Sequence, residues 1–361
     1  MKRYLGCMFF ALMVLLCGCG RDVPGEGGDR GKEGPWQRVD TAMGTVIQQT
    51  VYGAQETAEL FSEDVMEMLY QMEREELSWR LDTSQVYRIN RSAGLEEGCA
   101  LSEELAGLLE ACQELSVRSE GAFDVTLGRL TSLWNIDQWS TEENMTQFQI
   151  PSGKELEAAV ESCGSSKMKI VRNAESAGTE PDSGRARIWL PEGMRLDLGA
   201  VGKGLALSRI SRLLEEREEM GGAVISLGGS VLTYGVKPDG SPWKVGIVDP
   251  ADPSSHLGIL TLEGQWCVST SGDYERYVEA DGVRYHHILD PATGYPAQSG
   301  VGGVTVLVKD GLLSDGLSTA CFILGPEQGM ELAEAYGAET LFVMQDGSIR
   351  MSEGMETYFS R

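Results

Sequence analysis

The chain has 361 residues with 55 acidic and 30 basic side chains, and its formal net charge at pH 7 is −25. A hydrophobic content of 42% is enough for a sizeable core, so length and composition exclude wholesale disorder. The acidic excess argues against a nucleic-acid partner, because affinity for phosphate backbones depends on clustered Lys and Arg.

The first predicted element is a secretory signal. Lys2 and Arg3 precede an apolar run from Met8 to Leu16, which is about half the ~20 residues that a membrane-spanning helix needs. The run ends in Leu-Cys-Gly-Cys, which resembles the bacterial lipobox. Residues 1–18 are therefore interpreted as a lipoprotein signal peptide, and Cys19 as the lipidated first residue of an extracytoplasmic protein anchored to the bacterial cell membrane. An ordinary cleaved signal with an incidental cysteine is the alternative.

Residues 19–36 are predicted to hold the lipidated Cys19 and a flexible tether, because their Gly, Pro and charged side chains cannot offset the entropy of ordering. The remaining domain covers residues 37–361. Without the signal, 28 basic and 55 acidic side chains give a charge of −27. Five cysteines follow Cys19, an odd number with no CxxC spacing, so neither a zinc ribbon nor a complete disulfide framework is indicated.

Hydrophobic periodicity predicts the elements of this domain in chain order. A strand at 45–52 is followed by helices at 54–77, 102–115 (with Ser102 as N-cap) and 154–163, a surface loop at 173–184, and a helix at 203–217. Short strands are then expected at 223–227, 231–236, 243–248, 259–262, 266–269, 274–278 and 304–308, followed by helices at 312–324 and 326–336 and two closing strands. Strands in runs with intervening helices indicate an α+β fold, a single domain with a mixed, largely antiparallel β-sheet and flanking helices.

A glycine-rich turn at 196–207 (LDLGAVGKGLAL) joins a strand to a helix. Amides of the helix N-terminus and the Lys203 ammonium would face one point there, which suits a diphosphate. The segment is not a Walker loop, because Asp197 stands where that motif requires Gly and Gly204 where it requires Ser or Thr. It is not a GxGxxG motif either, because Leu207 stands where the third glycine should be. A plain strand-to-helix connection is the alternative.

Two of the three histidines, His286 and His287, precede the turn-forming sequence DPATGYP. An imidazole held beside a rigid turn is suited to act as a general base near neutral pH, although a packing role explains the residues equally well.

The sequence SDGLSTA begins at Ser314 and opens an apolar helix. Asp315 and Thr319 are four residues apart and share a helical face, with Ser318 close by. One carboxylate with hydroxyl and carbonyl oxygens suits Mg²⁺. The alternative is that Ser314 or Asp315 only caps the helix.

Taken in order, MGT (from Met43), GAFDVT (from Gly121), LDLGAVGKG, LGG (from Leu227), Pro242-Trp243, STSGDY (from Ser269), HHILDPATGYP and SDGLSTA resemble the ApbE family of FAD:protein FMN transferases. The resemblance runs from about residue 40 to 340. It implies transfer of FMN from FAD to a Thr or Ser hydroxyl of an acceptor flavoprotein, with AMP leaving and Mg²⁺ required. It also implies acceptors such as Rnf-type and Nqr-type electron-transfer subunits.

Residue by residue, the resemblance assigns flavin-nucleotide contacts to Met43, Ala122, Phe123, Asp124, Asp197, Lys203 and Leu289. It assigns the metal site to Ala200 (through its carbonyl), Asp315, Ser318 and Thr319. His287 corresponds to the family's histidine before the DP turn and is the candidate base, with Asp273 as the second candidate.

Two positions depart from the family pattern. Arg80 stands where relatives often carry an aromatic that contacts the flavin, with Trp79 next to it as a candidate substitute, and Ser230 stands where Asp is common. Neither is expected to touch the metal cluster. A Mg²⁺-dependent FAD pyrophosphatase and a non-catalytic flavin-binding lipoprotein are the alternative functions.

Overall fold

The computed structural model describes residues 35–140, 147–172, 186–217 and 219–361. The predicted signal peptide, Cys19, nearly all of the tether and the loop at 173–184 lie outside the described residues. In the part of the chain that is described, no helix is both long enough and apolar enough to cross a bilayer.

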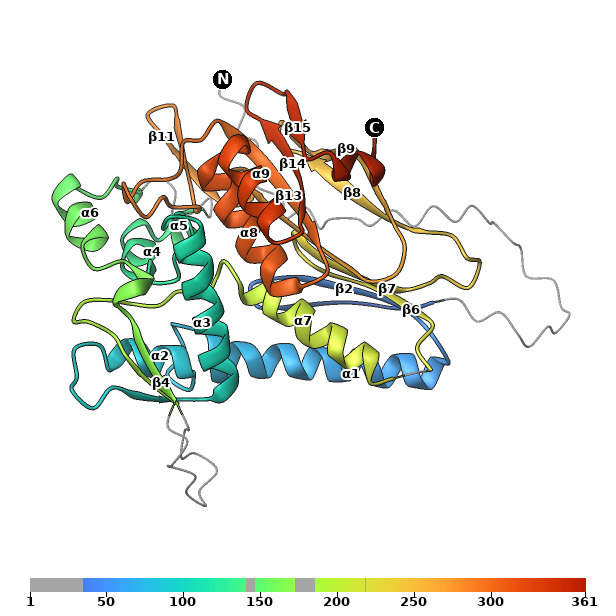
Figure 1. The fold of residues 1–361 in the computed structure, drawn as a ribbon, viewed down its shortest axis with the longest axis horizontal. Coiled ribbons are helices and arrows are strands. Elements are labelled where there is room, and N and C mark those ends of the chain that lie inside the picture. Colours follow the sequence, from blue (N-terminus) through green and yellow to red (C-terminus); the bar gives the residue numbers. More distant parts are fainter. Residues whose placement is uncertain (1–34, 141–146, 173–185, 218) are drawn as a thin grey trace, which may run out of the picture.

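An eight-stranded sheet forms the centre of the molecule (Figure 1). Every neighbouring pair of its strands is antiparallel, as the sequence predicts. The spatial order is β1 (Trp36–Ala42), β2 (Thr45–Tyr52), β6 (Gly222–Leu227), β7 (Ser230–Gly235), β10 (Trp266–Gly272), β13 (Val301–Val308), β14 (Glu339–Met344) and β15 (Ile349–Met351).

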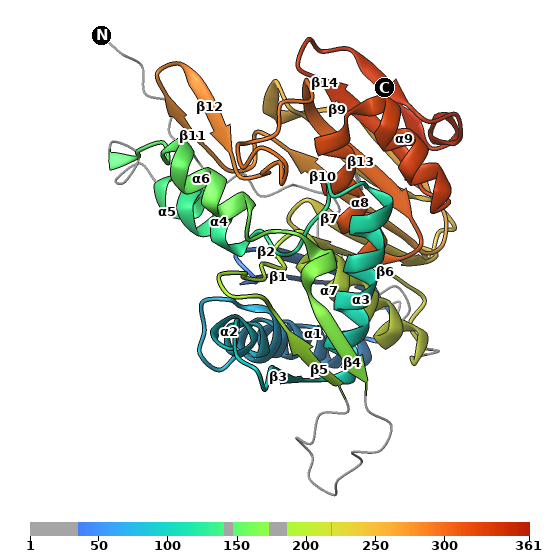
Figure 2. The same ribbon diagram turned by 60° about the vertical axis from the view of Figure 1, so that its left-hand side comes forward.

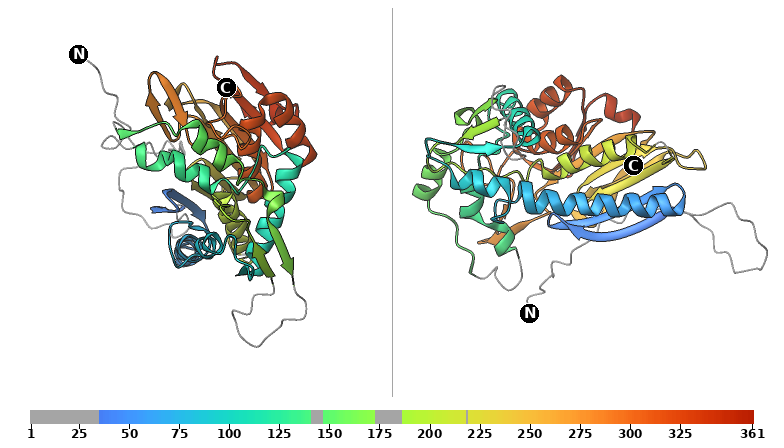
Figure 3. Two further views of the ribbon diagram at one scale, coloured as in Figure 1. Left: turned by 90° about the vertical axis from the view of Figure 1, so that its left-hand side faces the viewer. Right: turned by 90° about the horizontal axis from the view of Figure 1, so that it is seen from below.

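Helices cover one face of this sheet, namely α1 (Gln55–Gln71), α7 (Gly202–Glu215), α8 (Gly311–Leu324) and α9 (Pro326–Ala335). Seen from below, α1 runs alongside the first two strands (Figure 3). A three-stranded sheet of β8 (Trp243–Asp249), β9 (Asp252–Leu262) and β16 (Phe359–Ser360) covers the other face.

Side chains alternate between these two layers because successive residues of a strand point to opposite faces. In β10, Cys267 packs in the helix-side core and Val268 in the core beneath the small sheet. In β14, Phe342 and Val343 divide in the same way. The central sheet is therefore buried on both faces.

A second region packs against the first (Figure 2). It contains α2 (Gln85–Arg91), α3 (Glu103–Arg118), α4 (Gly128–Trp134), α5 (Ile136–Trp139), α6 (Gly153–Val160), a sheet of β3 (Cys99–Leu101), β5 (Ala186–Trp189) and β4 (Lys169–Arg172), and the hairpin of β11 (Tyr277–Ala280) and β12 (Val283–His286). The helices α4, α5 and α6 share an apolar cluster with this hairpin.

Most predicted elements are confirmed, including the Ser102 cap, whose Oγ accepts a hydrogen bond from the Leu105 amide at 3.2 Å. The helix predicted at 54–77 divides into α1 and a π-helical segment, η1 (Met72–Leu77). The strand predicted at 274–278 is wrong in its position, because β11 begins only at Tyr277. Short elements such as β3, α2 and β12 carry too few periodic positions to be recognised.

The five cysteines of the described domain are free. Cys112 and Cys321 behave as small core residues, with 2% and 0% exposure. Burial raises the pKa of each thiol to about 12, so both stay protonated and unreactive at neutral pH.

Candidate functional site

The segment that leads into α7 is held from several sides. The Asp197 amide donates to the Val125 carbonyl at 2.8 Å, which joins LDLG to GAFDVT. Asn90 forms two hydrogen bonds with the main chain of Leu196, at 2.7 and 2.9 Å. Two motifs separated by about 70 residues therefore form one surface at the start of α7.

Helix α7 crosses α8 at a pair of glycines. A Cβ on Gly204 would lie 2.3 Å from the Gly311 carbonyl oxygen, and a Cβ on Gly311 would lie 2.4 Å from the Gly204 carbonyl oxygen. Only glycine permits this approach. It brings the first turn of α7, with Lys203, against Asp315 of α8.

The Asp315 carboxylate caps α7. Its Oδ2 accepts a hydrogen bond from the Gly204 amide at 2.9 Å, and its Oδ1 lies 3.7 Å from the Lys203 Nζ. The alternative that Ser314 or Asp315 caps its own helix is wrong, because Asp310 is the N-cap of α8 and accepts from the Leu313 amide at 2.8 Å. One α7 amide of the predicted diphosphate cradle is thus already used by Asp315.

The expectation about Ser230 is also wrong. The Ser230 hydroxyl donates to Asp315 Oδ1 at 3.3 Å, so this departure touches the presumed metal cluster. The antiparallel pairing of β7 with β10 and the packing of α8 on β10 bring the two residues together. Because the Ser230 hydroxyl is neutral, Asp315 supplies the only carboxylate in this contact.

Hydroxyl and carbonyl oxygens surround Asp315. Ser318 Oγ donates to the Asp315 carbonyl at 2.8 Å and lies 2.8 Å from Ser271 Oγ, and Thr319 Oγ1 lies 3.4 Å from the same carbonyl. Among the residues that the structure describes, no group of three or more His, Cys, Asp or Glu is suited to a metal ion. The predicted set depends instead on one carboxylate with hydroxyl oxygens and the Ala200 carbonyl, which are the hard oxygen ligands that Mg²⁺ prefers.

The two histidines have different surroundings. His286 is 5% exposed, its Nε2 lies 3.0 Å from the Ala297 carbonyl, and its Nδ1 accepts from the Ile288 amide at 3.3 Å. Both ring nitrogens of His286 are therefore used by the main chain. His287 Nδ1 lies 3.2 Å from the Arg276 carbonyl, and its Nε2 has no hydrogen bond to any described residue.

The charge state of His287 suits a base. Desolvation by the surrounding protein, followed by the positive charge of Arg276, His286 and Lys203, holds the pKa of His287 well below 6.5. The imidazole is therefore neutral at pH 7.

Sequence reasoning missed Glu275. The pKa of its carboxyl is raised, chiefly by desolvation; the charges of Lys203 and Arg276 act to lower it, and that of Asp315 acts to raise it. Glu275 therefore shares the electrostatic environment of the site. Its position next to the STSGDY motif was the available signal.

Asp273, the second candidate base, is held by other partners. Its Oδ2 accepts from Gln345 Nε2 at 3.3 Å, and its Oδ1 pairs with Arg284 Nη1 at 3.5 Å. Each oxygen of the Asp273 carboxylate has a side-chain partner, whereas His287 Nε2 has none among the described residues, and this contrast favours His287 as the base.

Two of the predicted flavin-nucleotide residues, Met43 and Phe123, lie near the start of α7 or in the core around it. Met43 and Gly44 form a two-residue turn between β1 and β2 with φ of 53° and 70°. The Met43 Cε lies 3.6 Å from where a Cβ on Gly202 would be, so the hairpin tip reaches the first residue of α7. Phe123 is 1% exposed, and its amide donates to Ser119 Oγ at 3.0 Å, so its ring is buried and its amide already has a partner.

The remaining nucleotide predictions have clear structural surroundings. Asp124 Oδ1 accepts from the amide and hydroxyl of Thr126, both at 2.7 Å, and from Ser165 Oγ at 2.6 Å, so this carboxylate braces the loop beside Ala122. Asp197 Oδ1 accepts from the Gly199 amide at 2.9 Å. Leu289 is 5% exposed and packs in the apolar cluster of α4, α5 and α6. Direct contact of these residues with a nucleotide stays a prediction.

Arg80 occupies one face of Trp79, the candidate substitute for the family's aromatic. The Arg80 guanidinium lies 4.0 Å from the centre of the Trp79 ring and covers that face. The same guanidinium forms an ion pair with Asp137 at 2.9 Å.

The chain is similar to known proteins in sequence and in fold. A family model described as the ApbE family matches residues 43–342. A FAD:protein FMN transferase of Treponema pallidum (strain Nichols) is 32% identical over 97% of this chain and 95% of that protein. One from Salmonella typhimurium is 29% identical over 88% of this chain and 85% of that protein.

Solved structures agree with the sequence comparison. The fold is similar to the ApbE protein of Thermotoga maritima, with a TM-score of 0.77, 31% identity, and coverage of 91% of this chain and 100% of that one. It is also similar to the flavinyl transferase ApbE of Pseudomonas stutzeri in its apo form, with a TM-score of 0.74, 29% identity, and coverage of 92% and 99%.

Proposed function

This chain belongs to the ApbE family, and we propose that it is a FAD:protein FMN transferase, which moves the FMN half of FAD to a Thr or Ser hydroxyl of an acceptor protein and releases AMP. The observation that carries the proposal is that Lys203, Asp315 and His287, which come from distant segments of the chain, belong to one site. Lys203 lies 3.7 Å from Asp315, and both Lys203 and Arg276 act electrostatically on His287, whose Nε2 is free of described partners.

Mg²⁺ is the metal that the donor set fits. Asp315, Ser318 and Thr319, with the Ala200 carbonyl, would hold it, and it would offset negative charge on the diphosphate. Asp315 is 4% exposed and is oriented by the Gly204 amide and the Ser230 hydroxyl, which favours one fixed geometry.

The protein's own groups account for the remaining steps. His287 Nε2 takes the proton of the acceptor hydroxyl as its oxygen bonds to the FMN-side phosphorus. The bond from that phosphorus to the bridging oxygen breaks, and AMP leaves with that oxygen. Lys203 and the first amides of α7 stabilise the charge on the diphosphate, so positioning and electrostatics supply most of the catalysis.

The test uses the full-length protein in detergent with FAD, Mg²⁺ and a candidate acceptor domain, read by in-gel flavin fluorescence and by free FMN. Fluorescent acceptor supports the transferase. FMN and AMP without labelled acceptor would identify the pyrophosphatase, and intact FAD would identify a non-catalytic flavin carrier.

A matched pair of variants on α8 tests the site. Asp315→Asn should abolish turnover, whereas Asp310→Asn at the N-cap of the same helix should keep the activity. Wild-type rates for Asp315→Asn at low Mg²⁺ would exclude the proposed metal site.

The acceptors we propose are exported or membrane-associated flavoproteins, such as subunits of Rnf-type and Nqr-type electron-transfer complexes. Such an acceptor must present a Thr or Ser hydroxyl within reach of His287. Incubation with isolated domains of these subunits, each paired with a Thr→Val variant at the modified residue, measures this directly.

We also propose that Cys19 carries lipid and anchors the enzyme on the outer side of the cell membrane. The short apolar run that ends at Cys19 supports this proposal. Cys19→Ser should move the protein out of the membrane fraction and abolish palmitate labelling. Retention of both would mean that the segment is not a lipobox.

A further inference from the structure

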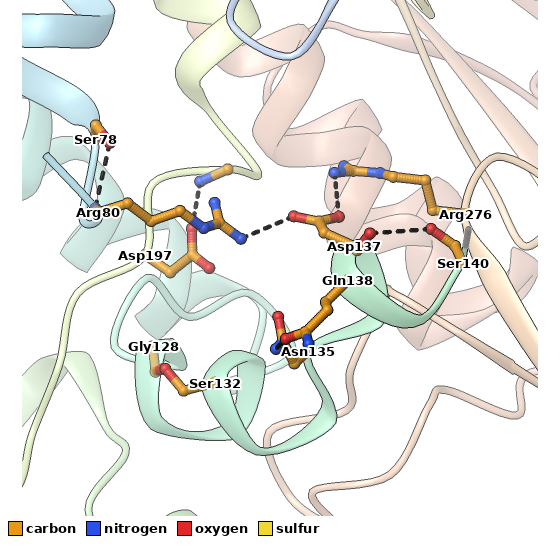
Figure 4. Close-up of polar contacts among 11 residues, drawn as sticks. Ser78, Arg80, Gly128, Ser132, Asn135, Asp137, Gln138, Ser140, Asp197 and Arg276 are labelled. Carbon is orange, nitrogen blue, oxygen red and sulfur yellow. Dashed lines mark hydrogen bonds and ion pairs between the residues drawn. The ribbon is translucent and has the colours of Figure 1, made fainter. Parts of the chain in front are cut away.

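Asp137 on α5 joins two arginines from distant parts of the chain. Its Oδ2 accepts from Arg80 Nη2 at 2.9 Å, and its Oδ1 accepts from Arg276 Nη1 at 2.7 Å. Figure 4 shows the two guanidinium groups reaching the carboxylate from opposite sides. Two charge-assisted hydrogen bonds, one on each oxygen, fix the orientation of the Asp137 carboxylate.

The main chain of Arg276 in turn holds His287. The Arg276 carbonyl accepts a hydrogen bond from the His287 amide at 3.1 Å and lies 3.2 Å from His287 Nδ1. A carbonyl oxygen accepts and cannot donate, so this contact requires the proton on Nδ1. In the neutral ring Nε2 then carries the lone pair, which is the form that a general base needs.

This arrangement depends on a hairpin outside the central sheet. Arg276 and His287 lie just beyond the last residue pair of the two-stranded β11–β12 sheet, Tyr277 with His286. An isolated two-stranded hairpin is only marginally stable, so its position depends on external contacts. Along the hairpin, Val278 packs among α4, α5 and α6. At the end that carries His287, the ion pair of Arg276 with Asp137 provides a side-chain anchor.

We propose that Asp137 is a positioning residue for flavin transfer: through Arg276 it keeps His287 in the Nδ1–H tautomer with Nε2 free for the acceptor hydroxyl. Arg80 supports this role by fixing the second oxygen of Asp137, which assigns a function to the residue that replaces the family's aromatic. The effect of Asp137 on catalysis rests on the proposed function, whereas its effect on the His287 tautomer does not.

The experiment measures the tautomer and the rate separately. The chain has three histidines, so ¹⁵N-histidine NMR of the full-length protein resolves each ring, and His287→Gln assigns the relevant signals. For wild type we expect the Nδ1–H pattern at His287 and the Nε2–H pattern at His286. Asp137→Asn should convert the His287 signals to a tautomer mixture and leave those of His286 unchanged.

In the transfer assay, Asp137→Asn should lower kcat roughly tenfold to a hundredfold, because a displacement of about 1 Å has that effect, and leave KM for FAD unchanged. Glu114→Gln is the control, since it removes a similarly exposed ion pair with Arg118 on α3. It should change neither the tautomer nor the rate.

An unchanged Nδ1–H pattern in Asp137→Asn overturns the proposal, whatever the rate. If wild type transfers no FMN while the variant still loses the pattern, the proposed function fails and the positioning role stands. Should Asp137→Asn not fold, Arg276→Gln removes the same ion pair and keeps the carbonyl, and the same outcomes apply.

Discussion

The crossing of α7 and α8 is the most demanding packing contact beside the site, and Gly204→Ala tests it. The added methyl group would lie 2.3 Å from the Gly311 carbonyl oxygen and 2.6 Å from the Asp315 Cβ. The nearest obstructing atom belongs to the main chain, so no change of rotamer relieves the contact. The two helices must move apart.

The magnitude follows from two opposing terms. Alanine in place of a helical glycine gains about 1 kcal/mol in helix propensity. Overpacking in a closely packed core typically costs about 1–3 kcal/mol, and rigid main-chain neighbours place Gly204 at the upper end. We therefore expect the free energy of unfolding to fall by about 1–2 kcal/mol.

Gly107 in the middle of α3 provides the control. A Cβ there meets only the far end of Arg172, with Nη2 at 3.7 Å, so Gly107→Ala should stabilise the protein by about 0.5–1 kcal/mol. Urea unfolding followed by tryptophan fluorescence measures both variants. Gly204→Ala should also lose activity, because the Gly204 amide orients Asp315 at 2.9 Å. A Gly204→Ala protein as stable as wild type would refute the reasoning.

The transfer rate should fall with acid as His287 becomes protonated, with a midpoint below 6.5 in the pH profile of kcat/KM, which reports the free enzyme; a midpoint above that value would count against this base. Because the pKa of His287 is lower in the folded than in the unfolded state, its contribution to stability is fully present above about pH 6.5 and is lost as the pH falls through the folded-state pKa. A comparison of Tm against pH for wild type and His287→Gln measures this contribution. Asn90→Ala removes both hydrogen bonds to Leu196 and should cost about 1–3 kcal/mol with a higher KM for FAD; unchanged unfolding would contradict this bracing role. Ser230→Asp sets a second carboxylate beside Asp315, so Tm should fall without Mg²⁺ and rise on adding Mg²⁺ by more than in wild type; a Tm insensitive to Mg²⁺ would argue against the metal site.

Much of this architecture was predictable because its causes are local. Alternating apolar residues predict strands such as β2, and the helical spacing predicts α1 and α8. The Ser102 cap acts over three residues. The order of eight short motifs carries the family resemblance without any knowledge of contacts, and the matched family model confirms it.

The resemblance predicted the site residues and a role for each, but not the contacts that hold them in place. The family resemblance selected His287 over His286, but the hydrogen bonds of the two rings became visible only in the structure, through the Ala297 and Arg276 carbonyls. Sequence also placed Asp315 as a possible cap of its own helix, although it caps α7, 111 residues away.

The sequence by itself determined the fold class and the family, and it supplied the list of candidate site residues. The tertiary structure decided which imidazole has a free nitrogen, which amide orients Asp315, that Ser230 touches this carboxylate, and that Asp137 lies behind His287. The physical reason is the range of the interactions. Propensity, periodicity and capping act over a few residues and leave a local pattern, whereas hydrogen bonds between segments up to 139 residues apart depend on how the sheet and helices pack.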